Sequence, residues 1–146
     1  MPTNMQNNYQ RKRGNRPAKG AKGRTITFSW VKLDINQGQS IEEWEESGLL
    51  SQLCKMMRQI GQLESSQVLA QQIVKQYTQV GFPPNSEFEI PKHVSPAYWA
   101  VIHIKPSSKE VVAGYLEEDV FHIVFLDREH KFWPTQNIQN RGKKKR

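Results

Sequence analysis

Residues 98–126, YWAVIHIKPSSKEVVAGYLEEDVFHIVFL, decide the fold, because three β-rich runs follow one another with only short polar gaps between them. The runs are Tyr98 to Ile104, Val111 to Tyr115 and Val120 to Leu126. β-Branched and aromatic residues dominate each run, and both gaps are short enough for hairpins. The stretch therefore predicts a three-stranded antiparallel meander, and Lys131 to Trp133 is a possible short fourth strand.

Upstream of the meander, the pattern predicts one strand and then two helices. Ile26, Phe28 and Trp30 alternate with polar residues, which indicates a strand with one buried face to about Leu33. Ser40 and Glu43 form a capping box that opens a helix at Ile41. Gly48 interrupts this helix, and beyond it a single apolar face at helical spacing holds Leu49, Leu50, Leu53, Met56, Met57 and Ile60.

A second helix is predicted from Ser65 or Ser66 through Tyr77, ending at Gly81 and the prolines that follow. The segment 82–96 holds four prolines and is predicted to be an extended connection. The sequence thus predicts an α+β fold: an N-terminal strand, two helices, and a three- to four-stranded antiparallel meander. We expect one domain over residues 25–140, between a disordered basic arm (1–24) and a basic tail (141–146).

Charge is strongly segregated along the chain. Twelve of its 21 Lys and Arg residues lie in the two ends, whereas all 14 acidic residues lie between Asp34 and Glu129. The segment 25–140 therefore has nine basic residues against 14 acidic ones, within a chain of net charge +7. Basic ends on an acidic body are typical of a protein that holds a polyanion with its termini.

Nucleic acid is the expected partner, with RNA slightly favoured over DNA, and the acidic body is expected to contact another protein or to lie away from the nucleic acid. Lys and Arg gain affinity by releasing counterions from phosphates. A solubilising tail without a ligand is the alternative, and an acidic membrane surface is disfavoured because no amphipathic helix accompanies the arm. The expected nucleic-acid contacts are Arg11, Lys12, Arg13, Arg16, Lys19, Lys22, Arg24, Trp133, Arg141, Lys143, Lys144, Lys145 and Arg146.

The sequence also favours a cytoplasmic setting. Cys54 is the single cysteine, so no intrachain disulfide framework is possible. The N-terminus lacks the apolar run of a signal peptide, and no stretch is apolar enough to cross a membrane.

A candidate catalytic site lies at one edge of the predicted meander. The first and third strands of a meander run the same way, so the loops after His103 and after Leu126 should emerge at the same edge. A histidine among basic residues suits acid–base catalysis and charge stabilisation during phosphodiester cleavage. The candidate catalytic residues are His130, His103, Lys105, Arg128 and Lys131.

Structural roles compete with these assignments. His103 alternates in phase with Trp99 and Val101, so a partly covered sheet residue is the favoured interpretation. His122 shares a strand face with valines and is expected to be packed or edge-exposed, and residues 127–131 resemble a solvated turn of alternating charge. The four histidines are separated along the chain, so neither a metal nor a cofactor is expected. Trp133 beside Lys131 is the aromatic best placed to stack on a base.

The order of elements, together with residues 114–133, GYLEEDVFHIVFLDREHKFW, resembles the small RelE-type bacterial ribonuclease toxins. The resemblance covers about 100 residues in arrangement only. It implies metal-independent endoribonuclease activity, with Arg128, His130, Lys131 and Trp133 as the counterparts of the family's basic and late aromatic or histidine residues. The chain departs from the family in its acidic meander, which carries Glu110, Glu117, Glu118 and Asp119.

Three hypotheses follow from the sequence. The first is a nucleic-acid-binding protein that acts through its basic termini. The second is a toxin-like endoribonuclease with a His/Lys/Arg site at the meander loops. The third is a protein-binding adaptor with an apolar groove around Leu49 to Ile60.

Overall fold

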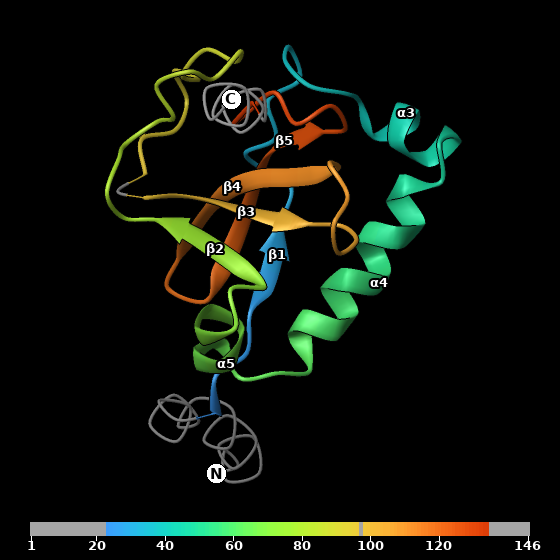
Figure 1. Cartoon of the computed structure of the whole chain (residues 1–146). Coiled ribbons are helices and arrows are strands. Elements are labelled where there is room, and N and C mark those ends of the chain that lie inside the picture. The colour runs from blue at the N-terminus through green and yellow to red at the C-terminus, as the bar shows by residue number, and fades with distance from the viewer. Residues whose placement is uncertain (1–22, 97, 135–146) are drawn as a thin grey trace, which may run out of the picture.

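The computed structural model describes residues 23–96 and 98–134, which form an α+β fold around a five-stranded mixed sheet (Figure 1). The strand order is β1-β5-β4-β3-β2. The α+β class predicted from the sequence is confirmed. The elements are β1 (Thr27–Ser29), α3 (Ile41–Glu46), α4 (Leu49–Gly61), α5 (Ser65–Ala70), β2 (Val74–Tyr77), β3 (Trp99–His103), β4 (Val111–Glu117) and β5 (Val120–Asp127).

The meander β3-β4-β5 forms as predicted, with both pairs of neighbouring strands antiparallel. One bulge interrupts the β4–β5 ladder, because Ala113 pairs with Phe125 whereas Gly114 pairs with Ile123, which leaves Val124 as the extra residue. A Cβ atom at Gly114 would collide with the carbonyl oxygen of His122. Glycine is therefore required where the two backbones approach most closely.

β1 is shorter than predicted and lies at one edge of the sheet, parallel to β5. The chain turns after Ser29, where Leu33 N donates to Trp30 O at 3.1 Å. It then returns to β5, since Asp34 N donates to Val124 O at 2.8 Å and Gln39 N donates to Leu126 O at 3.0 Å. These bonds satisfy β5 along the side that a longer β1 would have occupied.

The helices begin where the sequence predicts. Ser40 caps α3, with its side-chain oxygen accepting from Glu43 N and its own N–H donating to the Glu43 carboxylate. Gly48 separates α3 from α4 with a positive φ of 79°, which glycine adopts without strain. The apolar face of α4 packs on the sheet through buried Leu49, Leu53 and Ile60. Much of the face on which the sequence analysis placed an adaptor groove thus packs into the core, and Leu50, Met56 and Met57 remain half-buried at its margin.

The helix predicted from Ser65 through Tyr77 is wrong in its second half. α5 ends at Ala70, and Gln72 adopts a left-handed φ of 57° that redirects the chain. Val74–Tyr77 then pairs antiparallel with β3 as the second edge strand. The β-branched pair Ile73-Val74 suits this pairing, and hydrogen bonding to β3 outweighs the weak helical periodicity.

The possible fourth strand over Lys131 to Trp133 is also wrong, because this segment is irregular. It instead helps to cover the sheet face opposite the helices. That face holds an aromatic cluster of Trp99, Tyr115, Phe125 and Phe132, with Phe88 from the Pro-rich segment 82–96 stacked on Phe125. Figure 1 shows α3 and α4 along one side of the sheet, away from the loops of segment 82–96. Among the described residues, no helix is long and apolar enough to cross a membrane.

Candidate functional site: a histidine pair at the end of the sheet

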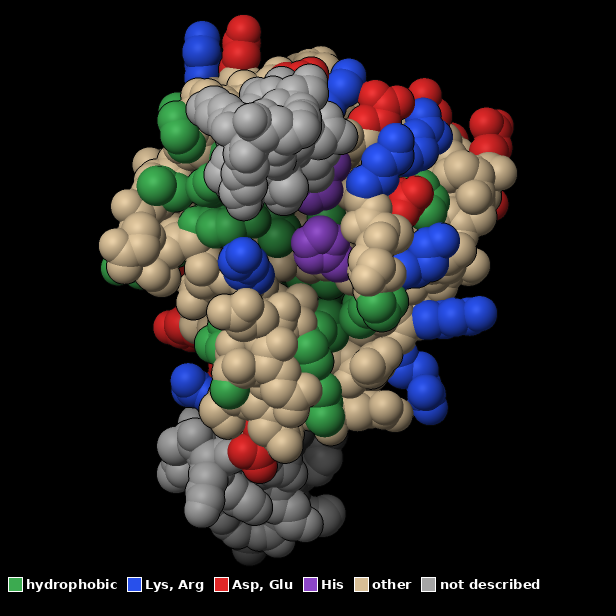
Figure 2. Space-filling model, in the orientation of Figure 1, with side chains coloured by type: hydrophobic (Ala, Val, Ile, Leu, Met, Phe, Trp, Pro, Cys, Tyr) green, Lys and Arg blue, Asp and Glu red, His purple; other side chains and the backbone are tan. Residues whose placement is uncertain are grey.

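Two of the predicted site residues lie side by side. His103 is the last residue of β3, and His130 lies in the loop after β5; their ring centroids are 5.8 Å apart. Figure 2 shows histidine side chains gathered near the middle of this face, beside hydrophobic side chains. The shared direction of β3 and β5 brings the two histidines to one edge, as the sequence analysis expected.

Backbone carbonyls fix which ring nitrogen of each histidine carries a proton. Nδ1 of His103 lies 3.3 Å from the carbonyl oxygen of Ser108, and Nδ1 of His130 lies 2.5 Å from that of Trp133. A carbonyl oxygen only accepts, so each Nδ1 must be the donor. In the neutral form, Nε2 of each ring then holds the lone pair, which is the state a general base requires.

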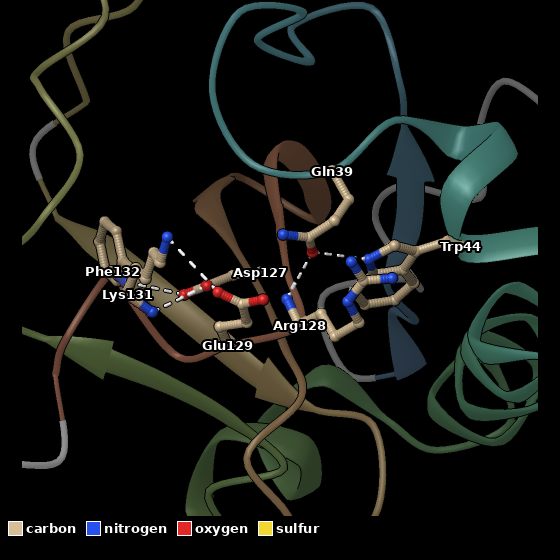
Figure 3. A network of polar contacts seen from close by, with 7 residues as sticks. All are labelled: Gln39, Trp44, Asp127, Arg128, Glu129, Lys131 and Phe132. Carbon is tan, nitrogen blue, oxygen red and sulfur yellow. Dashed lines mark hydrogen bonds and ion pairs between the residues drawn. The ribbon is translucent and has the colours of Figure 1, made fainter. Parts of the chain in front are cut away.

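A buried carboxylate shapes the loop that carries His130. Asp127 is fully buried, and its two oxygens accept from Lys131 N at 2.8 Å and Phe132 N at 2.7 Å (Figure 3). Burial raises the pKa of Asp127, and the two backbone hydrogen bonds oppose that rise. His130 itself has a left-handed φ of 60°, so this loop conformation depends on the contacts that hold it.

The environment of His103 favours its neutral form. Burial lowers the pKa of His103 below its ordinary value of 6.5. The hydrogen bond to Ser108 opposes this change, whereas the positive charges of His130 and Lys75 add to it. His103 therefore stays an unprotonated base to lower pH than an isolated histidine does.

Lys75 and Tyr77 complete the cluster, and the sequence analysis missed both because it placed them in a helix. On β2, Lys75 lies opposite Val101 and Tyr77 lies opposite Trp99, so both share the sheet face of His103. The Lys75 ammonium lies 5.7 Å from the Tyr77 ring centroid. The available signal was the β-branched pair Ile73-Val74 with Tyr77 close behind it, residue types that are enriched in strands.

Trp133 joins the same cluster through its ring. Its centroid lies 4.6 Å from that of Tyr77, with the ring planes at 32°. Both rings are half-buried. Burial raises the pKa of Tyr77 to about 12, so its hydroxyl stays protonated and does not act as a base near neutral pH.

The other predicted basic residues are placed differently. The ammonium of Lys131 lies 3.4 Å from a carboxylate oxygen of Glu129. Lys105 is exposed in the β3–β4 loop. The pKa of Glu110 in the same loop is lowered mainly by a hydrogen bond from the backbone of Glu110 itself, and the charge of Lys105 contributes. Arg128 donates its backbone N–H to Gln39 Oε1 at 2.6 Å, and Figure 3 shows its side chain directed toward Trp44, away from Lys131.

The remaining histidines are held elsewhere. The ring of His122 stacks on Tyr115 at 4.8 Å, and its Nε2 lies 3.3 Å from a Glu117 carboxylate oxygen. His93 Nε2 lies 2.8 Å from the carbonyl oxygen of Lys32. Within residues 23–96 and 98–134, no group of three or more His, Cys, Asp or Glu side chains is arranged to hold a metal ion.

Most of the basic termini, residues 1–22 and 135–146, lie outside the described residues. Arg24 is the one N-terminal arm residue that the structure describes among the predicted nucleic-acid contacts, and its Nε forms a 2.7 Å ion pair with Asp119. No protein-family model, no curated protein and no solved structure matches the chain. The chemistry of the site itself is therefore the basis for proposing a function.

Proposed function

We propose that this protein is an RNA-binding endoribonuclease that cleaves at the His103–His130 pair. The observation that supports this proposal is the 5.8 Å separation of the two rings, combined with backbone hydrogen bonds that leave each Nε2 as the reactive nitrogen. Two imidazoles at one site can supply a general base and a general acid for the same phosphodiester, with no need for a metal. This makes RNA, with its internal 2′-hydroxyl nucleophile, the matching substrate.

In the proposed reaction, neutral His103 removes the proton of the 2′-hydroxyl through Nε2. The 2′-oxygen then forms a bond to phosphorus while the bond from phosphorus to the 5′-oxygen of the next nucleotide breaks. Protonated His130 gives its Nε2 proton to that leaving oxygen. The products are a 2′,3′-cyclic phosphate and a free 5′-hydroxyl, and the protein has gained one proton on His103 and lost one from His130.

His103 is assigned as the base because its environment lowers its pKa and its side chain is exposed to a substrate, whereas His130 is half-buried in the loop after β5. Lys75 is the lysine whose positive charge acts on His103, and in the proposed reaction it balances the charge that develops on the phosphorane. Lys131 and Lys105 are less suited to this role, because each has a carboxylate nearby that offsets its charge. Glu129 pairs with Lys131, and Glu110 interacts with Lys105. The positive charge near the histidine pair is therefore small, and binding of an RNA strand needs a second source of cations.

The basic termini provide that second source. They hold 12 of the 21 basic residues, against a body with more acidic than basic residues. Residue 141 follows Trp133 by eight positions. Eight residues span at most about 30 Å when fully extended, so the C-terminal basic run begins within that distance of Trp133. RNA that is held by this run stays within reach of the histidine pair.

Cleavage of labelled single-stranded RNA by the full-length protein tests the proposal, with DNA of the same sequence in parallel. We expect RNA but not DNA to be cut, and we expect either His103→Ala or His130→Ala to remove cleavage. His93→Ala is the matched control, because His93 also contacts a backbone carbonyl but lies outside the cluster. If wild-type protein cuts no RNA, or if both variants cut normally, the proposal is wrong.

Nucleic-acid binding without chemistry is the second candidate, and the charge segregation of the chain supports it. It predicts RNA binding whose log K falls by about 0.7 to 0.9 per phosphate contact with log salt concentration. It further predicts that binding is lost when residues 1–24 and 141–146 are removed. Binding with this salt dependence but without cleavage would select this candidate over the enzyme.

A further inference from the structure

We propose that the half-buried ring of Trp133, supported from behind by Tyr77, stacks on one unpaired nucleobase of single-stranded RNA next to the cleaved phosphate. This inference depends on the proposed function, because it names the substrate class of the same site. The evidence for stacking comes from the two aromatic rings and Lys75, and not from the histidine pair.

The two rings form a support rather than a slot. Their centroids lie 4.6 Å apart, which leaves no space for a third ring between them. The Lys75 ammonium lies 5.7 Å from the Tyr77 centroid, so Tyr77 has Trp133 and Lys75 as its neighbours. The base-stacking ring is therefore Trp133, and Tyr77 is a positioning residue that fixes its orientation.

The aromatic support is joined directly to the histidine pair. The backbone oxygen of Trp133 accepts from His130 Nδ1, so the residue that would contact the base also orients one catalytic ring. Tyr77 and Lys75 share a sheet face with His103. A nucleotide with its base on Trp133 thus has its phosphate on the side where Lys75, His103 and His130 supply cationic and hydrogen-bonding groups.

This arrangement selects single strands. A base within a duplex is already stacked on both faces, so it cannot offer a face to Trp133 without being unstacked. Stacking on an aromatic ring tolerates any base, because every base has a π face. We therefore expect a preference for unpaired RNA with little base specificity, which differs from recognition through hydrogen bonds to base edges.

The test measures binding of the full-length protein to two single-stranded DNA probes, one normal and one carrying abasic sites, by fluorescence anisotropy. DNA lacks the 2′-hydroxyl that the proposed reaction requires, so binding is observed without cleavage. We expect the normal probe to bind about ten-fold more tightly than the abasic probe. Trp133→Leu should remove this difference, whereas Trp133→Phe should keep most of it, because phenylalanine retains an aromatic face.

Cleavage kinetics supply the second measurement. We expect Trp133→Leu to raise KM for single-stranded RNA more than it lowers kcat, whereas a variant with a disturbed histidine pair would mainly lose kcat. His93→Ala, outside this cluster, is the control and should keep both kinetic constants. Equal binding of both probes by wild-type protein, or unchanged discrimination in Trp133→Leu, overturns the subsite. Because the probe comparison involves no cleavage, failure of the subsite and failure of the ribonuclease proposal are separate results.

Discussion

The two ends of β5 differ in how their polar groups are used. At the start of the strand, Arg24 forms a 2.7 Å ion pair with Asp119, and Thr27 N donates to the Asp119 carbonyl oxygen at 2.9 Å. At the other end, buried Asp127 shapes a loop that brings His130 to His103 and leaves a lysine and two half-buried rings beside them. The contacts at the first end hold the start of β1 against β5. Those at the second end bring together groups that can act on a ligand.

Two histidines on the strands that flank β4, His122 on β5 and His103 on β3, illustrate the same difference. His122 stacks on Tyr115, and its Nε2 faces Glu117. His103 instead uses Nδ1 for a backbone contact, and its side chain is exposed although its neighbours partly desolvate the ring. A residue type alone therefore carries little information about function, and its neighbours decide whether a reactive nitrogen is available.

The largest effect should come from removing the histidine pair. We expect His103→Ala and His130→Ala each to lower kcat for RNA cleavage by roughly 10²- to 10⁴-fold, because general acid or base catalysis contributes about that much. The double variant should be little worse than either single variant, since the two groups act as one unit. Single-turnover cleavage rates check this, and strictly multiplicative losses would mean that the two residues act independently.

Breaking the second end of β5 should cost stability as well as activity. Asp127→Ala leaves the part-buried N–H of Lys131 and the buried N–H of Phe132 without their acceptor, so we expect the free energy of unfolding to fall by about 3 kcal/mol. Asp127→Asn keeps one acceptor oxygen and should lose about half as much. Urea denaturation measures both values, and an alanine variant as stable as wild type would show that these bonds do not hold the loop.

At the end of β5 that carries Asp127, folding stability and RNA cleavage should depend on pH in different ways. Because the folded-state pKa of His103 is lowered, its contribution to stability is complete above pH 6.5 and is lost as the pH falls through the lowered value. The raised pKa of Asp127 acts in the opposite sense, since its contribution is present below the ordinary value of 3.8 and is lost as the pH rises through the folded-state pKa.

For activity, we expect the acidic limb of kcat/KM to have an apparent pKa below 6.5, because His103 must be neutral to act as the base. Lys75→Gln should move this apparent pKa slightly upward, since one of the charges that oppose protonation is gone. A pH–rate profile of wild type and variant measures both. An acidic limb centred at or above 6.5 in wild type would argue against His103 as the base.

The smallest effect should come from the first end of β5. The Arg24 side chain is 50% exposed, so Arg24→Ala should lower the free energy of unfolding by less than about 1 kcal/mol. Cleavage by the folded variant should be unchanged, in contrast to Asp127→Ala. A large loss of cleavage in Arg24→Ala would show that the two ends do not have the separate roles described above.

Much of the frame was predictable from local signals. The three β-rich runs within residues 98–126, with short polar gaps between them, predicted the meander, and the Ser40–Glu43 capping box placed the start of α3. The direction of the strands also predicted that the loop carrying His130 would lie at the edge where β3 ends. These features depend on residues close together in sequence, or on strand connections that allow few alternatives.

The rest of the site depends on contacts that no local pattern encodes. Lys75 and Tyr77 enter the site only because β2 adds to β3, and the periodicity of the preceding residues favoured a helix there. The loop over 127–132 has a charged sequence typical of a solvated turn, but Asp127 is buried and binds its backbone. Arg128 and Lys131 point away from each other because Gln39, distant in sequence, holds the backbone of Arg128.

Analysis of the RNA ends that the full-length protein produces tests the central claim most directly. A single-stranded RNA carrying one 2′-deoxynucleotide should be cut at its ribonucleotides and left intact on the 3′ side of the deoxynucleotide, and mass spectrometry should find 2′,3′-cyclic phosphate ends in the presence of EDTA. His103→Ala should form these ends at least about 10²-fold more slowly. Cleavage next to the deoxynucleotide, or cyclic ends formed at the wild-type rate by His103→Ala, would contradict the assignment of the histidine pair.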